Sequence, residues 1–447
     1  MLRLYNTASK KLEEFKPLSD VVKIYTCGPT VYSEAHIGNL TAFIYWDLLV
    51  RVLKADNYKV RRVLNLTDVG HLTSDADSGE DKLEKGASKE GLTVWEVADK
   101  YIAKFMDDYH ALSLLEPEVL ARATDYIEDD IEAVDLMTKN GFTYETRDGV
   151  YYDTSKFNKY ADFARLDLAG LQAGARVEFS DEKKNASDFA VWKFIQPGEK
   201  HAMRWDYLGK PGYPGWHLEC ASIIHKELGE PIDIHTGGID HIPVHHTNEI
   251  AECHAAYGHR LAKYWLHCDF ITIDGQKISK SLGNVYSLSD LNERGFSAMD
   301  YKMWVLSGHY QGTRNFTFES LEAAKNRRLN WRNRIARCYQ KSVPSDKVFG
   351  KILDAVNDNL NTAEAFAVID NSVLTLEDWQ KIDELFGLKL VDETPDISED
   401  TYKLIEERQE ARVKRDFKRA DEIRDELSRM NIEVNDTDDG PVWRYTK

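Results

Sequence analysis

The stretch VVKIYTCGPTVYSEAHIGNLTAFIYWDLLVRVLKADNYKVRRVLNLTDV, residues 21–69, decides the fold class. It opens with an apolar, β-branched run at 21–27, passes through a loop with glycine and proline, and continues as a largely apolar helical pattern at 40–57. A second strand pattern follows at 60–69. A strand, a helix and a further strand in this order predict a βαβ unit, and hence an α/β fold with a parallel sheet.

Further along the chain, the sheet pattern is interrupted and then returns. PIDIHTGGID at 231–240 and DFITIDG at 269–275 look like strands of the same parallel sheet that end in glycine-bearing loops. The stretch 112–195 between the two halves of the sheet is predicted to be an insertion, with a hairpin signal at Asp148-Gly149. After about 318 the pattern is helical, and the tail predicts a basic helix, a short strand and a closing turn, which is typical of a small separate module.

Composition limits the class of protein. The 447 residues carry 58 basic and 76 acidic side chains, a net charge of −18, with 42% hydrophobic residues, which indicates a globular protein of two to four domains and not a disordered chain. No apolar run is long enough for a membrane span and the N-terminus lacks a signal core, so we expect a cytoplasmic protein. Five scattered cysteines fit reduced thiols or metal ligands. The charge argues against general affinity for nucleic acid but permits a local basic face.

Two loops carry residues suited to phosphate. CGPTVYSEAHIGN, 27–39, lies between a predicted strand and a predicted helix, where free backbone N–H groups and the helix dipole favour an anion. DGQKISKSLGN, 274–284, places two lysines three residues apart in a glycine-bracketed loop. Each pattern also has a purely structural interpretation, as a turn with a capping histidine and as a solvated charged surface. Both loops are predicted to follow strands of one parallel sheet, whose ligands bind beyond the carboxyl ends of the strands.

Histidines and cysteines are concentrated in the second half of the predicted sheet. Nine of the 14 histidines fall between 217 and 267. A helix through HHTNEIAECHAAY would place His245 and Glu249 on one face, and Cys220 and Cys27 could complete a tetrahedral zinc site. Structural roles in the core or as a helix cap are the alternative for these side chains. The spacing also leaves rival ligands open, namely Cys253, Cys268, His246 and His254.

Four separated motifs and the C-terminal tail together resemble a known family. CGPTVYSEAHIGN is similar to the HIGH signature of class I aminoacyl-tRNA synthetases, and KISKS at 277–281 is similar to their KMSKS loop. With PGWHLECA, DIHTGGIDHIPVHHTNE and the tail KRADEIRDEL…GPVWR, the chain resembles the cysteinyl-tRNA synthetase family from about residue 20 to its end. The resemblance implies a Rossmann-like catalytic domain at 1–111 and 196–285, a connective insertion at 112–195, a stem-contact segment at 286–317, a helical bundle at 318–395 and a small anticodon-binding module at 396–447.

The resemblance also implies roles for individual residues. One zinc ion would be held by Cys27, Cys220, His245 and Glu249, and Mg²⁺ would accompany ATP. The chain departs from the family signature at Asn39, which replaces the second histidine of HIGH and can still donate to a phosphate through its amide. The implied catalytic residues are His36, Asn39, Lys277 and Lys280, the implied ATP-binding residues Gly38, Lys280 and Ser281, and the implied substrate-binding residues Thr67, Trp216, His217 and Asp240.

The implied partners are ATP, L-cysteine and tRNA(Cys), with no membrane and a monomeric chain. Two basic runs would face tRNA phosphates: Arg327, Arg328, Arg332, Arg334 and Arg337 in the first, and Arg412, Lys414, Arg415, Lys418 and Arg419 in the second. Two other functions remain open at this point. One is a ligase that joins cysteine to an amino sugar, against which the basic C-terminal module argues. The other is a zinc-containing RNA-binding protein without catalysis, against which the lysine pair and the HIGH-like loop argue.

Overall fold

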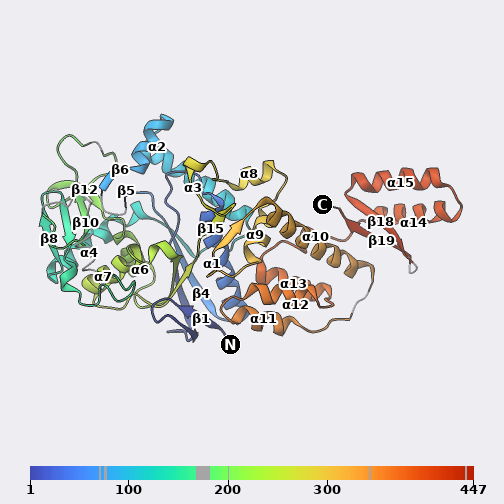
Figure 1. Ribbon diagram of the computed structural model, residues 1–447, viewed down its shortest axis with the longest axis horizontal. Coiled ribbons are helices and arrows are strands. Elements are labelled where there is room, and N and C mark those ends of the chain that lie inside the picture. Colours follow the sequence, from blue (N-terminus) through green and yellow to red (C-terminus); the bar gives the residue numbers. More distant parts are fainter. Residues whose placement is uncertain are drawn as a thin grey trace.

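A five-stranded, all-parallel sheet lies at the centre of the catalytic region (Figure 1). The computed structural model describes residues 1–69, 72–74, 78–167, 182–199, 201–341, 344–437 and 440–446, with the backbone alone at 72–74, 78–82 and 280. The strand order is β14-β13-β3-β4-β7, so the chain changes direction across the sheet between β3 and β13. Ligands of such sheets bind at this switch point. The strands are β3 Val21–Thr26, β4 Lys59–Leu66, β7 Val119–Arg122, β13 Ile232–Gly238 and β14 Ala262–Cys268.

Helix α1, Ile37–Ala55, confirms the helical pattern predicted at 40–57. It is buried along most of its length because it packs against the sheet on one side and against helices of the C-terminal half on the other. This double packing explains why its sequence is apolar almost all round. The other helices of the catalytic region are α2 Lys82–Glu90, α3 Val94–Ala111, α4 Ile127–Lys139, α6 Leu218–Glu227 and α7 His245–Tyr257.

A second, antiparallel sheet forms the inserted part, in the order β11-β12-β10-β9-β8. The predicted Asp148-Gly149 turn is present, since β8 and β9 form a hairpin with Thr146 opposite Gly149. Strand β7 belongs to the parallel sheet, although it falls inside 112–195, and β11 and β12 lie beyond 195. We therefore propose that the insertion runs from β8 to β12. Its strands are β8 Thr143–Thr146, β9 Gly149–Tyr152, β10 Phe189–Phe194, β11 Trp205–Tyr207 and β12 Lys210–Pro214.

The prediction that 269–275 is a strand of the parallel sheet is wrong. The edge position belongs to the preceding buried run β14, whereas β15, Ile271–Ile273, pairs with β16, Gln276–Lys277, and β17, Arg314–Phe316, in a separate small sheet. The KISKS loop, residues 277–281, therefore extends from this small sheet. The remaining short strands are β1 Arg3–Asn6, β2 Lys11–Glu14, β5 Leu72–Ser74 and β6 Ser78–Asp81.

The C-terminal half is helical, as predicted, and ends in a small module (Figure 1). The module has two helices and a two-stranded hairpin, where the sequence predicted one basic helix, a short strand and a closing turn. Helix starts follow the expected chemistry: the side chains of Ser287, Ser297, Thr317 and Thr375 each accept from the backbone of the third helical residue. The helices are α8 Leu288–Glu293, α9 Ala298–Leu306, α10 Phe318–Gln340, α11 Phe349–Asn357, α12 Thr362–Asp370, α13 Leu376–Phe386, α14 Glu399–Val413 and α15 Phe417–Arg429, and the hairpin is β18 Ile432–Thr437 with β19 Gly440–Tyr445.

Gln340, the last residue of α10, joins the module to this long helix. Its side-chain amide donates to the Trp443 carbonyl and its side-chain oxygen accepts from the Trp443 N–H, both at 2.9 Å. The Gln340 side chain thus makes two hydrogen bonds to the backbone of β19, as a neighbouring strand would. A membrane-spanning helix is not found in the part of the chain that the structure describes, since each helix there is too short or too polar.

Candidate active site

His36 and Asn39 close the N-terminus of α1 in a reciprocal arrangement. The Nδ1 atom of His36 accepts from the Asn39 backbone N–H at 3.2 Å, and the Oδ1 atom of Asn39 accepts from the His36 N–H at 3.2 Å. This is a capping box, with histidine and asparagine in place of the usual serine or threonine and glutamate. The asparagine that departs from the HIGH signature therefore stabilises the helix start, and its oxygen is held by that contact.

A cavity of about 200 Å³ separates this helix start from the KISKS loop. Its lining includes residues 29–36, Asn39 and, from the opposite side, Ile278 and Ser279. The two loops predicted to bind phosphate therefore face each other. Gly38 lies against the KISKS loop, because a Cβ atom there would stand 2.6 Å from Ile278 Cδ1 and 3.0 Å from the His36 ring.

The KISKS loop is held by its own polar contacts. Asn284 accepts from the Ser279 N–H at 2.8 Å and donates to the Lys277 carbonyl at 3.1 Å, and the hydroxyls of Ser279 and Ser281 lie 2.8 Å apart. Lys277 is exposed at the end of β16, and its side chain is not needed for these contacts. The Lys280 side chain lies outside the described atoms, so its predicted role stays a prediction.

The four predicted metal ligands converge behind the carboxyl edge of the parallel sheet. Cys27 follows β3, Cys220 lies on α6, and His245 and Glu249 lie one turn apart on α7. One ligand atom from each lies within 4.8 Å of the others, and all four residues are buried. The Nε2 atom of His245 is 3.0 Å from Glu249 Oε1 and 3.6 Å from Cys220 Sγ. Two thiols, an imidazole and a carboxylate are a donor set that fits zinc.

A second donor group shares Cys27 and Glu249 with the first and adds two other histidines. His246 Nε2 lies 3.3 Å from Cys27 Sγ, and His235 Nε2 lies 2.6 Å from Glu249 Oε2. His246 was an open rival in the sequence, whereas His235 was missed. A hydrogen bond from a neighbouring imidazole orients a ligating carboxylate, and His235 can do this for Glu249. Among the described residues, the other rivals Cys253, Cys268 and His254 belong to neither group.

The surroundings favour the anionic forms of two members of the first donor group, Cys27 and Glu249. Burial raises the pKa of the Cys27 thiol, but the Cys220 thiol and the imidazoles of His246 and His235 outweigh it and hold that pKa well below its usual value. The pKa of Cys220 is raised by its hydrogen bond to Cys27 and by burial. Burial likewise opposes ionisation of Glu249, yet the nearby imidazoles lower its pKa to about 2. Buried anionic donors of this kind favour a bound cation, whose binding would release the remaining protons.

Two of the predicted substrate residues contact the metal-ligand candidate His245. The Trp216 ring stacks on the His245 ring at 4.7 Å, and His217 Nδ1 lies 2.9 Å from His245 Nδ1. Thr67 follows β4 at the carboxyl edge, where its backbone pairs with Pro29 and Val31. Asp240 is exposed in the turn between β13 and α7. The structure thus brings Trp216 and His217 to the donor group and places Thr67 and Asp240 along the same edge of the sheet.

Comparisons with known proteins agree over the whole chain. A family model described as the tRNA synthetases class I (C) catalytic domain matches residues 14–326, and one described as the cysteinyl-tRNA ligase anticodon binding domain matches residues 394–444. The chain is 43% identical to cysteine–tRNA ligase 1 of Burkholderia lata, covering 98% of this chain and 96% of that protein, and 38% identical to the cysteine–tRNA ligase of Treponema denticola, covering 99% of each. The chain belongs to the cysteinyl-tRNA ligase family.

The fold of this family member extends to other class I synthetases. A solved structure of Mycobacterium tuberculosis methionyl-tRNA synthetase in complex with methionyl-adenylate superposes with a TM-score of 0.57, at 14% sequence identity and covering 88% of this chain and 84% of that one. At this identity the likeness shows the fold alone, and it confirms the predicted Rossmann-like architecture.

In this cysteinyl-tRNA ligase family member, the first basic run serves mainly to hold the bundle together. Arg328 is buried and pairs with Asp300 and Glu393, so the prediction that it contacts tRNA is wrong. A helix of basic sequence can turn part of its charge inward when acidic side chains of neighbouring elements meet it. Arg327, Arg332 and Arg334 also contact the bundle through their guanidinium groups, whereas Arg337 is exposed.

The first residue of α15 carries an exposed aromatic ring that the sequence analysis missed. Phe417 is 59% exposed, and the side chains of Lys414, Arg415 and Lys418 around it are exposed as well. An exposed ring among cations is a surface on which a nucleobase can stack. The signal was readable in KRDFK at 414–418, where one aromatic residue interrupts a basic run.

Proposed function

We propose that this chain activates L-cysteine with ATP to cysteinyl-adenylate and transfers the cysteinyl group to the 3′ end of tRNA(Cys). One observation carries the proposal: the segment that follows β3 supplies Cys27 to the two-thiol, imidazole and carboxylate donor group and residues 29–36 to the cavity between the HIGH-like and KISKS loops. A thiol substrate and a nucleotide could therefore be bound side by side. Family membership, with both the catalytic and the anticodon-binding domain matched, supports the same function.

Adenylate formation needs orientation and positive charge more than covalent catalysis. The cysteine carboxylate attacks the α-phosphate of ATP and pyrophosphate departs, so charge develops on phosphate oxygens. His36, Asn39 and Gly38 would present the N-terminus of α1 to the phosphates. Lys277 and Lys280, with Ser281, would stabilise the departing pyrophosphate from the opposite loop, and Mg²⁺ would accompany ATP.

The donor group of Cys27, Cys220, His245 and Glu249 would hold zinc. When bound, zinc would ligate the substrate thiol as a thiolate. Around it, Trp216 and His217 would form one wall of the substrate pocket through their contacts with His245. Thr67 would line the pocket at the carboxyl edge of the sheet, and Asp240 would bind the substrate ammonium group.

The small C-terminal module would bind the anticodon of tRNA(Cys). Its exposed Phe417 and the neighbouring cations support this, because single-stranded bases bind through stacking and phosphate contacts. The negative charge of the whole chain would restrict polyanion binding to such local surfaces. We further propose that the chain acts as a cytoplasmic monomer.

Two assays test the proposed function. Cysteine-dependent exchange of pyrophosphate into ATP is expected, and absence of exchange would exclude an activating enzyme in favour of a zinc-containing RNA-binding protein. Acceptance of the cysteinyl group by tRNA(Cys) is expected next. Transfer to an amino sugar instead of tRNA would identify the alternative cysteine ligase.

Replacing Gly38 by alanine should slow pyrophosphate exchange about 10²-fold, because the added Cβ atom would displace the KISKS loop by its contact with Ile278 Cδ1. The KM for cysteine should change little. Ile278→Val removes the clashing atom, so the double variant should recover part of the rate. Gly350→Ala, at a helical glycine with open space around its Cβ position, serves as the control. Wild-type exchange in Gly38→Ala would contradict the close approach of the two loops.

Replacing Phe417 by alanine should lower kcat/KM for tRNA(Cys) about tenfold, the usual effect of removing one base–aromatic stack. Pyrophosphate exchange should be unchanged, since Phe417 lies in the C-terminal module. Met430→Ala provides a matched control, because Met430 is also exposed in the module, at the opposite end of α15. Equal effects of the two substitutions on charging would remove Phe417 from the tRNA surface.

A further inference from the structure

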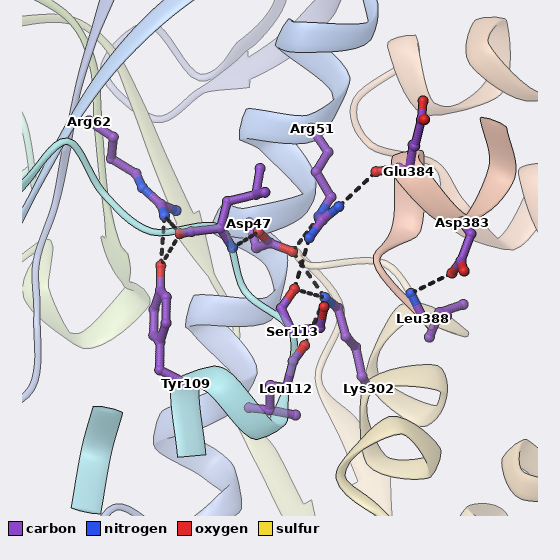
Figure 2. Close-up of polar contacts among 11 residues, drawn as sticks. Asp47, Arg51, Arg62, Tyr109, Leu112, Ser113, Lys302, Asp383, Glu384 and Leu388 are labelled. Carbon is purple, nitrogen blue, oxygen red and sulfur yellow. Dashed lines mark hydrogen bonds and ion pairs between the residues drawn. The ribbon is translucent and has the colours of Figure 1, made fainter. Parts of the chain in front are cut away.

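A buried cluster of charges lies where α1 meets the C-terminal half of the molecule (Figure 2). Asp47, on α1, accepts from Arg51 Nε at 2.8 Å, from Lys302 Nζ at 3.0 Å and from the Leu115 backbone N–H at 2.8 Å. The side chains of Asp47 and Lys302 are completely buried, and that of Arg51 is 10% exposed. We call Asp47, Arg51 and Lys302 the α1 charge cluster.

The two cations of the cluster reach further, to backbone carbonyls of separate segments. Arg51 donates to Glu384 O at 2.7 Å at the end of α13 and to Ser113 O at 2.8 Å after α3. Lys302, on α9, donates to Leu112 O at 3.0 Å. Figure 2 shows these contacts converging from four segments on one point beside α1. The cluster therefore fixes the catalytic helix, the segment after α3, α9 and the bundle helix α13 relative to one another.

The end of α13 fits closely over Arg51. Gly387 caps this helix with a positive φ of 60°, and a Cβ atom there would stand 2.6 Å from the Arg51 guanidinium. Asp383 holds the turn that follows by accepting from the Leu388 and Val391 N–H groups. The bundle thus meets the arginine with backbone, through the Glu384 carbonyl and at Gly387, where a side chain would not fit.

Stability alone does not explain such a cluster. Burial opposes the charges of Asp47 and Lys302: it lowers the pKa of Lys302 to about 8, although Asp47 counteracts the effect. Apolar side chains of similar volume commonly replace a buried ion pair without loss of stability. Apolar contacts would not fix the orientation of the packed segments, because they are not directional. Each N–H donor of the cluster, in contrast, binds one carbonyl and so favours one orientation of the segment that carries that carbonyl.

The same helix carries the proposed phosphate site at its N-terminus. α1, Ile37–Ala55, is capped by His36 and contains 19 residues, and Asp47 and Arg51 lie in its second half. Further contacts with α9 run between the two points: the Tyr301 hydroxyl lies 2.7 Å from Thr41 Oγ1 and donates to Ile37 O at 2.7 Å. These contacts tie the first turns of α1 to α9 independently of the cluster.

We infer that Asp47 is a positioning residue for the tRNA-dependent step: through Arg51 and Lys302 it sets the orientation of the helical bundle relative to α1. Because the C-terminal module is attached to the bundle helix α10, this orientation sets the place where the 3′ end of a tRNA held by the module meets the adenylate. The inference rests on the proposed function. Activation of cysteine needs only the catalytic region, so it does not depend on this orientation. Transfer to tRNA does.

The test uses the full-length triple variant Asp47→Leu/Arg51→Met/Lys302→Met, which leaves no buried charge unpaired. We expect its thermal unfolding to match that of the wild type and its pyrophosphate exchange to stay within about twofold. Its kcat/KM for tRNA charging is expected to fall about tenfold, and separate values of kcat and of the KM for tRNA will show which step changes. Wild-type charging would overturn the inference, and so would an equal loss of exchange and charging.

The conservative variant Arg51→Lys keeps the test decisive if the triple variant does not fold. It retains the charge beside Asp47 but has no planar fork to reach Glu384 O and Ser113 O together. It should show the same selective loss of charging, to a smaller degree, and wild-type charging by Arg51→Lys would overturn the inference. The matched control is Asp148→Asn/Lys193→Met, an ion pair within the antiparallel sheet that is remote from the bundle. Absence of exchange in the wild type would instead refute the proposed function.

Discussion

Replacing His245 or Cys220 by alanine is expected to raise the KM for cysteine sharply and to reduce discrimination against serine toward the roughly 10²-fold that a pocket acting by shape alone can give. Cysteine and serine differ by one atom, and a cavity that admits the thiol cannot exclude the smaller hydroxyl. A thiol bound to zinc ionises and forms a strong Zn–S bond, whereas an alcohol is a poorer ligand. Kinetics with both amino acids and a metal analysis of each variant provide the measurement.

Two further variants make this experiment specific. Cys253→Ala is the matched control, because Cys253 is a buried cysteine on α7 that belongs to neither donor group. It should leave metal content and discrimination unchanged. His246→Ala separates the two donor groups, since only the second group contains that residue. Loss of metal from His246→Ala together with retention in Cys220→Ala would assign the ion to the second group. A zinc-free variant that still rejected serine as well as the wild type would remove the metal as the specificity filter.

Replacing Lys277 by alanine is expected to slow pyrophosphate exchange about 10²–10³-fold, with little change in the KM for cysteine. Its charge would act mainly as pyrophosphate departs, so the loss should fall on the rate and not on amino-acid binding. The backbone of the loop should keep its shape, because Asn284 holds the Lys277 carbonyl and not its side chain. Single-turnover formation of the adenylate measures the effect.

Lys381→Ala is the control for this experiment, since Lys381 is an exposed lysine of the bundle that pairs with Glu377. It should exchange pyrophosphate at the wild-type rate. A wild-type rate in Lys277→Ala would remove this lysine from the mechanism and leave the role to Lys280. A raised KM for ATP with an unchanged maximal rate would indicate ground-state binding in place of transition-state stabilisation.

The sequence predicted the parts of the fold in which local pattern and tertiary role agree. The βαβ unit at 21–69 is present with small shifts at its ends, because its strands and helix are apolar enough to be buried on all sides. The prediction for 269–275 was wrong because there the local pattern and the tertiary role disagree. It has the composition of a buried strand, but the equally apolar β14 directly before it occupies the sheet edge. Such competition between neighbouring runs is decided by packing and not by local pattern.

The candidate site was predictable to a similar extent. The i, i+4 spacing of His245 and Glu249 could be read on a helix, but only the fold brings Cys27 from the end of β3 and Cys220 from α6 to the same point. His235 was missed because a single histidine within a buried strand has no distinctive spacing. The arginines of α10 were misjudged because their acidic partners, such as Asp300 and Glu393, lie far away in the sequence.

The junction between Gln340 and Trp443 has a mechanical consequence. α10 contains 23 residues, so as a straight rod it measures about 35 Å, and the module is fastened to its far end. A rod of this length works as a lever: a tilt of about 5° at its base moves its tip by roughly 3 Å, comparable to one hydrogen-bond length. A small change in the packing of α10 against α9 would thus become a larger displacement of the anticodon-binding module. Conversely, a force on the module from a wrong anticodon would act on the contact between α10 and α9.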